Sequence, residues 1–122
     1  TQALLPCMMG DNWGRVIHIS SHGAIDGDVG TMAYSASKSG LIGMSRVLAK
    51  EYARFKITSN VLVLGAFETG LFLELSDEQK NNIQKKIPSK KLGDSSNIVN
   101  AIEFLIKSDF VNGSTISIDG GV

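Results

Sequence analysis

Residues 56–64 read KITSNVLVL, and the last four of them, Val61 to Leu64, form an uninterrupted apolar run. Such a run is typical of a strand that is covered on both faces, as in a parallel sheet. Two further segments rich in β-branched residues predict strands at 15–20 (RVIHIS) and 114–118 (STISI). The sequence therefore predicts three strands, the last of which stops at the turn residues 119–121.

Helical patterns separate these strands. Apolar residues recur at three- and four-residue steps from about residue 32 to residue 55, and again from 95 to 108. A weaker helical pattern runs from 71 to 87, and residues 1–9 are typical of the tail of another helix. Strands that alternate with helices predict right-handed βαβ units, and so an α/β fold with three parallel strands and flanking helices.

The composition is that of one ordinary globular domain spanning residues 1–122. Of these residues 43% are apolar and 20% charged, and the chain contains no repeat or domain linker. Because the formal net charge is zero, no general attraction to nucleic acid or to an anionic membrane is expected. A basic stretch between 80 and 91 has no interleaved aromatic residues to stack on bases, so we interpret it as a solvated helix face and loop.

The single cysteine, Cys7, excludes an internal disulfide framework and fits a reducing cytoplasm. It lies in the segment TQALLPCMM, an apolar run that is too short to span a bilayer. The same segment lacks the basic start and the small-residue cleavage site of a signal peptide. These features predict a cytoplasmic protein without a membrane partner.

The segment Tyr34-Ser-Ala-Ser-Lys38 places a phenol and an ammonium four residues apart at the start of the long predicted helix. At this spacing the two side chains share one helix face. A nearby cation stabilises a phenolate, which makes a tyrosine a usable proton donor or acceptor near neutral pH. Ser21, at the end of the first strand, could hydrogen-bond the same substrate oxygen.

The same spacing occurs a second time, in Tyr52 and Lys56, preceded by Ser39. Ser39 and Tyr52 would lie on one helix about 20 Å apart, at about 1.5 Å per residue, so they could not converge. Ser21 and Tyr34 are instead separated by a strand end and a glycine-rich loop, which lets the chain fold back. Only the first set is therefore predicted to form a site.

The two histidines raise an alternative. His22 adjoins Ser21, but a hydrolytic Ser-His pair needs a third group that orients the imidazole, and adjacent side chains at a strand end usually point apart. Structural or solvent-exposed roles are therefore favoured for His18 and His22. No cluster of Cys, His, Asp or Glu has the spacing of metal ligands, so no metal site is predicted.

Four segments resemble the short-chain dehydrogenase/reductase family in order and spacing, and most closely its 3-oxoacyl-carrier-protein reductase type. The segments are GRVIHISS (14–21), MAYSASKSGLIGMSRVLAKEYA (32–53), ITSNVLVLGAFETGL (57–71) and KLGDSSNIVNAIEFLIKSDFVNGSTISIDGG (91–121). The resemblance covers nearly the whole chain. It implies the C-terminal half of a doubly wound, Rossmann-like parallel sheet.

By motif position, the resemblance implies three catalytic residues. Tyr34 would be the general acid/base. Lys38 would stabilise the ionised form of Tyr34 and hydrogen-bond the nicotinamide ribose. Ser21 would orient and polarise the substrate carbonyl. The loop after the second strand would face the nicotinamide. The implied cofactor-binding residues are Tyr34, Lys38, Gly65, Phe67 and Thr69.

The resemblance also implies partners. The cofactor would be NADP or NAD, and the substrate a ketone or secondary alcohol, with a 3-oxoacyl thioester suggested by the reductase type. The protein would form a homo-oligomer, either a dimer or a tetramer. Asn60 matches an asparagine whose role in the family is structural.

The sequence departs from the family's pattern in its dinucleotide-binding half. The glycine-rich phosphate loop is absent, as is the residue that distinguishes NAD from NADP, so that choice stays open. We expect more protein upstream of Thr1, and we do not expect tight cofactor binding by the 122 residues alone. The usual Pro-Gly after the second strand is Leu64-Gly65 here, which removes a φ-restricted residue.

Two hypotheses follow. The first is an NAD(P)-dependent oxidoreductase with a Ser-Tyr-Lys site. The alternative is a truncated, non-catalytic fragment that serves only in assembly or oligomerisation. The segment 71–88 would form a lid apolar enough for an acyl chain or a steroid, so the identity of the substrate stays open.

Overall fold

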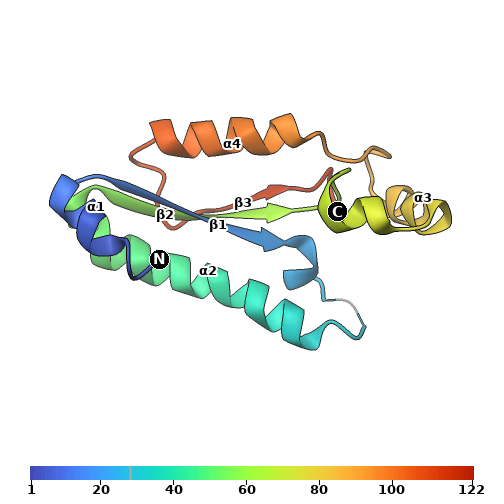
Figure 1. Cartoon of the computed structure of the whole chain (residues 1–122), viewed down its shortest axis with the longest axis horizontal. Helices are drawn as coiled ribbons and strands as arrows, with labels where there is room; N and C mark the ends of the chain where they lie inside the picture. Colours follow the sequence, from blue (N-terminus) through green and yellow to red (C-terminus); the bar gives the residue numbers. More distant parts are fainter. Residues whose placement is uncertain (28) are drawn as a thin grey trace.

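The three predicted strands are present in the computed structural model, which describes residues 1–27 and 29–122. They are β1 (Gly14–Ser21), β2 (Ile57–Leu64) and β3 (Thr115–Ile118), and they pair in parallel in the order β1-β2-β3 (Figure 1). The continuous apolar run therefore belongs to the central strand, and the predicted α/β fold is confirmed. Asp28, in the predicted loop 22–31, lies outside the described residues.

Helices cover both faces of this sheet. α2 (Met32–Tyr52) packs on β1 and β2, and a 3-10 turn at Ala53–Phe55 prolongs it to the predicted end. α1 (Leu5–Asp11) contacts β1, and α4 (Ser95–Lys107) lies on the opposite face from α2 (Figure 1). Both long helices begin where the apolar periodicity predicted, which places the start of α2 at the edge of the sheet where β1 ends.

The weaker helical pattern at 71–87 is broken in two. A 3-10 segment (Gly70–Glu74) precedes α3 (Asp77–Lys86), and Ser76 caps the second piece. Ser76 Oγ accepts a hydrogen bond from the N–H of Gln79 at 3.3 Å, and the N–H of Ser76 donates to Gln79 Oε1 at 3.0 Å. Because this reciprocal capping box satisfies two N–H groups that the helix leaves free, α3 begins at a defined residue.

β2 supplies the centre of the core. Its residues from Ile57 to Val63 are all buried, and two of the polar side chains among them, Ser59 and Asn60, are hydrogen-bonded. Ser59 Oγ lies 3.0 Å from Ser45 Oγ of α2 and 3.2 Å from His18 Nε2 of β1. Burial lowers the pKa of His18, because desolvation penalises the charged imidazole. His18 therefore has the structural role that the sequence predicted.

Two asparagines tie β2 to the segment that leads into β3. Asn60 donates to the carbonyl oxygen of Val111 at 2.8 Å and accepts from the N–H of Ser114 at 3.0 Å. Asn112 accepts from the N–H of Ser59 at 2.8 Å and donates to a carbonyl oxygen of α2 at 3.1 Å. These bonds satisfy backbone groups that would otherwise be unpaired near the core. They give Asn60 the structural role that the resemblance implied.

Candidate active site

The carboxyl ends of β1 and β2 meet at one edge of the sheet, because the two strands run in the same direction. Ser21, the last residue of β1, pairs in register with Leu64, the last residue of β2. The loop from Gly65 to Thr69 continues from there, and Tyr34 lies in the first turn of α2. In open parallel sheets, ligands bind at this edge.

Lys38 connects α2 to β1 through two hydrogen bonds. Ser20 Oγ donates to the carbonyl oxygen of Lys38 at 3.0 Å, and Lys38 Nζ donates to the carbonyl oxygen of Ile19 at 2.9 Å. An ammonium group has three N–H donors. Two donors of Lys38 therefore remain for a ligand, one helical turn from Tyr34.

Tyr34 stands in an open pocket of about 310 Å³, here called the Tyr34 pocket. The pocket is lined by Tyr34, Leu64, Gly65, Ala66, Phe67, Thr69, Phe72 and Ile98. Tyr34 is 48% exposed, and its hydroxyl makes no hydrogen bond to any residue that the structure describes. The pocket thus gathers Tyr34 with the predicted cofactor-binding residues Gly65, Phe67 and Thr69.

Ser21 lies in a larger pocket of about 500 Å³, here called the Ser21 pocket. The pocket is lined by Ser21, His22, Gly23, Asp26, Leu64, Gly65, Ala66, Ile83, Lys86, Ile87 and Val122. Leu64, Gly65 and Ala66 belong to both pockets, so the carboxyl end of β2 lies between Ser21 and Tyr34. Within residues 1–27 and 29–122, no hydrogen bond joins the side chains of Ser21, Tyr34 and Lys38.

Backbone contacts fix the loop after β2. The N–H of Gly65 donates to the carbonyl oxygen of Ile118 at 3.0 Å, and the N–H of Gly93 donates to that of Ala66 at 2.9 Å. A Cβ on Gly65 would lie 2.7 Å from the Cα of Asp119, so only glycine permits this close approach. The loop therefore keeps a fixed position between β3 and the segment before α4.

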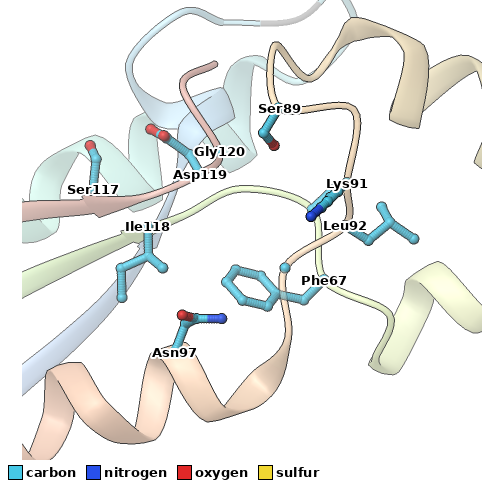
Figure 2. Close-up of a pocket in the computed structure, with 11 residues that line it drawn as sticks. Phe67, Ser89, Lys91, Leu92, Asn97, Ser117, Ile118, Asp119 and Gly120 are labelled. Carbon is cyan, nitrogen blue, oxygen red and sulfur yellow. The ribbon is translucent and has the colours of Figure 1, made fainter.

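Phe67 secures the same loop from the α4 side. Its ring packs on Gly93, where an added Cβ would lie 2.3 Å from a ring carbon, and the residue is only 7% exposed. Figure 2 shows the ring inside a further pocket of about 310 Å³, between Ile118 of β3 and Asn97 of α4. Phe67 therefore anchors the loop and also lines the Tyr34 pocket.

Three polar residues of the Ser21 pocket, His22, Asp26 and Lys86, were not among the predicted site residues. His22 Nε2 lies 2.8 Å from Asp26 Oδ2, and its Nδ1 lies 3.9 Å from Asp119 Oδ2. The four-residue step from His22 to Asp26 was a signal in the sequence for this pair. Lys86 reaches the pocket only because α3 folds at the carboxyl end of β2, and no local pattern in the sequence indicates that placement.

The residues present fit the reacting end of a nicotinamide cofactor. The Tyr34 hydroxyl, two free donors of Lys38 and the exposed Thr69 can hydrogen-bond a ribose or a carboxamide. Gly65 and Ala66 leave the floor of the Tyr34 pocket without bulky side chains. The sequence holds no G-x-G-x-x-G phosphate loop for the pyrophosphate, so the fit is to one end of the cofactor.

In the part of the chain that the structure describes, no group of three or more His, Cys, Asp or Glu side chains could hold a metal ion. Across the same residues, every helix is too short or too polar to cross a membrane.

Comparisons with known proteins agree on one group. A family model described as "Enoyl-(Acyl carrier protein) reductase" matches residues 1–122. The 3-oxoacyl-[acyl-carrier-protein] reductase FabG of Haemophilus influenzae is 37% identical over the full chain, which covers 51% of the relative. The human 3-oxoacyl-[acyl-carrier-protein] reductase is 35% identical over 99% of the chain and 50% of the relative.

A solved structure gives the same result. The TT0495 protein of Thermus thermophilus matches 98% of the chain with a TM-score of 0.88 and 33% identity, over 53% of its own length. The chain thus spans about half the length of the curated relatives it matches. The matched half contains the strands, α2 and both pockets described above.

Proposed function

The chain belongs to the short-chain dehydrogenase/reductase family, and on that premise we propose that the protein is an NAD(P)-dependent oxidoreductase acting on a ketone or secondary alcohol. One observation carries the proposal. Tyr34 exposes an unbonded hydroxyl in a pocket beside the loop after β2, one helical turn from the ammonium of Lys38. A phenol placed in this way can exchange a proton with a bound carbonyl or alcohol.

In the proposed reaction Tyr34 is the general acid/base. During reduction its hydroxyl gives a proton to the substrate oxygen, and during oxidation the phenolate takes that proton back. The nicotinamide, when bound, supplies or accepts the hydride. Lys38 stabilises the phenolate through its positive charge, and its free donors would hold the nicotinamide ribose.

Ser21 has the role of orienting the substrate. Its hydroxyl lies at the end of β1, across the carboxyl end of β2 from Tyr34, and can donate to the substrate oxygen. A donor aimed at this oxygen stabilises the negative charge that develops there during hydride transfer. Gly65, Phe67 and Thr69 would contact the cofactor, with Thr69 contributing an exposed hydroxyl.

The substrate class follows from the relatives. Both curated relatives quoted above are named 3-oxoacyl-[acyl-carrier-protein] reductases, so we propose a 3-oxoacyl thioester reduced with NADPH. NADH is the alternative, because the residue that selects between the two lies in no part of this sequence. The cytoplasm is the proposed compartment, where an exposed thiol such as that of Cys7 stays reduced.

The protein is also proposed to form a homo-oligomer, either a dimer or a tetramer. Large apolar side chains are exposed on both long helices, among them Met44 and Val47 of α2 and Val99 and Phe104 of α4. Burial of such side chains against a second copy would remove them from water. Light scattering on the purified protein would give the number of copies.

The test is the variant Tyr34→Phe in the intact protein. We expect kcat for reduction of a 3-oxoacyl thioester to fall about 10²- to 10⁴-fold, with unchanged Tm, because the lost hydroxyl has no structural bond. Tyr52→Phe is the matched control, since it repeats the spacing at the far end of α2. Full activity of Tyr34→Phe would exclude the proposed mechanism. No binding of NADPH or NADH to the intact wild type would favour the non-catalytic fragment.

A further inference from the structure

The Ser21 pocket is built by four separate parts of the chain. β1 and the turn after it supply Ser21 and His22, the end of β2 supplies Leu64 to Ala66, α3 supplies one wall, and the C-terminal Val122 supplies another. Figure 1 shows α3 and the C-terminus beside the carboxyl ends of the strands. At about 500 Å³ the pocket has room for the part of a substrate that extends from its reacting carbonyl.

The pocket has one acidic and one basic side chain, and the basic one has no partner among the described residues. Asp26, its one acidic lining residue, lies 2.8 Å from the imidazole of His22. Lys86 is the remaining charged lining residue, and it makes no ion pair or hydrogen bond with any residue in 1–27 or 29–122. An ammonium without a partner at the rim of a pocket attracts an anionic group of a ligand.

The rest of the wall is apolar. Leu64, Ile83 and Ile87 line the pocket together with Ser21 and the exposed Lys86, and Ile87 is only 2% exposed. A ligand that contacts both Ser21 and Lys86 can therefore also pack on an aliphatic surface. The Tyr34 pocket differs from the Ser21 pocket, because none of its lining residues has a charged side chain.

We propose that the substrate arm in the Ser21 pocket is aliphatic near the reacting carbonyl and bears an anionic group farther along, which Lys86 recognises. This proposal rests on the proposed function, because it takes Ser21 as the group that orients the carbonyl. The anionic group is a carboxylate at the end of an acyl chain or a phosphate on the thioester arm. Lys86 is thus a specificity-determining residue and takes no part in proton transfer.

The experiment measures the binding of two matched pairs of ketones to the intact protein by calorimetry. The carboxylate pair is 5-oxohexanoate and 2-hexanone, and the phosphate pair is acetoacetyl-4′-phosphopantetheine and acetoacetylpantetheine. We expect the anionic member of one pair to bind about fivefold more tightly than its neutral partner, which is the range of a partly exposed ion pair. The pair that shows the preference identifies the source of the charge.

Two variants assign this preference to one side chain. Lys86→Gln should abolish it, whereas Lys85→Gln, the adjacent exposed lysine of α3 outside the Ser21 pocket, should retain it. Equal affinities within both pairs, an equal loss in the two variants, or no saturable binding of either anionic ketone would each overturn the proposal.

The proposed function is tested separately on the neutral ketones. In one outcome, turnover of acetoacetylpantetheine depends on Tyr34, but the anionic and neutral ketones of each pair bind equally well. That outcome would exclude the role of Lys86 and leave the proposed oxidoreductase activity intact. A charge preference in binding, without any turnover that depends on Tyr34, would instead remove the oxidoreductase and leave the pocket's anion specificity.

Discussion

The ammonium of Lys38 and the carbonyl oxygen of Ile19 are joined by a hydrogen bond of 2.9 Å, which fixes the long helix α2 to the strand that ends in Ser21. Ser20 strengthens the same junction through its bond to the backbone of Lys38. The same contacts between α2 and β1 therefore hold both Lys38 and Ser21 of the proposed site in position. A shift of α2 along β1 would displace both relative to the end of β2.

Lys38→Met should impair both catalysis and folding. The variant removes the charge that stabilises the Tyr34 phenolate, so we expect kcat to fall at least about 10²-fold. It also removes the bond to Ile19, at a cost of about 0.5–1 kcal/mol in the free energy of unfolding. Lys50→Met, an exposed lysine in the last turn of α2, is the control. An equal loss of kcat in the control would show that the effect is not local to the site.

Gly93→Ala should loosen the loop that carries Gly65 to Thr69. The new Cβ would overlap the ring of Phe67, so the ring must move, at a cost of about 1–3 kcal/mol in unfolding free energy. Gly10→Ala in α1 meets no atom within 4 Å and should be neutral or slightly stabilising. Urea denaturation measures both changes. Equal stability of the two variants would contradict the packing of Phe67 on Gly93.

Asn60→Ala should be among the most destabilising polar substitutions in the chain. It leaves the carbonyl oxygen of Val111 and the N–H of Ser114 without partners beside the core, at a cost of about 2–4 kcal/mol. Asn100→Ala, at an exposed position of α4, should change stability by less than about 0.5 kcal/mol. Thermal unfolding followed by circular dichroism compares them, and a similar Tm for both would refute the assigned role of Asn60.

The stability of the fold should decrease in mild acid because of His18. Burial lowers the pKa of this imidazole below its ordinary value of 6.5, so the unfolded chain takes up the proton first. The free energy of unfolding therefore falls as the pH drops from 6.5 toward the lower pKa of the folded state. The variant His18→Gln should be less stable than the wild type at neutral pH, but its free energy of unfolding should fall less on acidification. Parallel urea curves at pH 7.5 and 5.5 test this, and identical losses would exclude His18 as the source.

The strands were predictable because their signals are local. The segments expected at 15–20, 56–64 and 114–118 match the observed strands closely. No strand begins or ends more than one residue from its predicted bound. In each case a run of β-branched or apolar residues is bounded by a turn or a charged residue. The break at Ser76 was missed, although Ser76 and Gln79 spell the capping box, because the weak apolar pattern continues across it.

The composition of the Ser21 pocket was not predictable from the sequence. His22, Lys86 and Val122 reach it from segments far apart in the chain, and their meeting depends on how α3 and the C-terminus pack at the end of β2. Tyr34 and Lys38 were easier to predict, because a four-residue step on one helix fixes their relation before any tertiary contact forms.

The register of the sheet also sets the order in which the protein can be built on the ribosome. Gly14 pairs with Ile57 and Val61 with Thr115, so each pairing closes a loop of more than forty residues. Loops of this length close slowly, and the apolar strand β2 leaves the ribosome well before β3 exists to cover its second side. Until synthesis passes Ile118, the nascent chain exposes the segment most prone to aggregate, and chaperone binding there would be of greatest benefit.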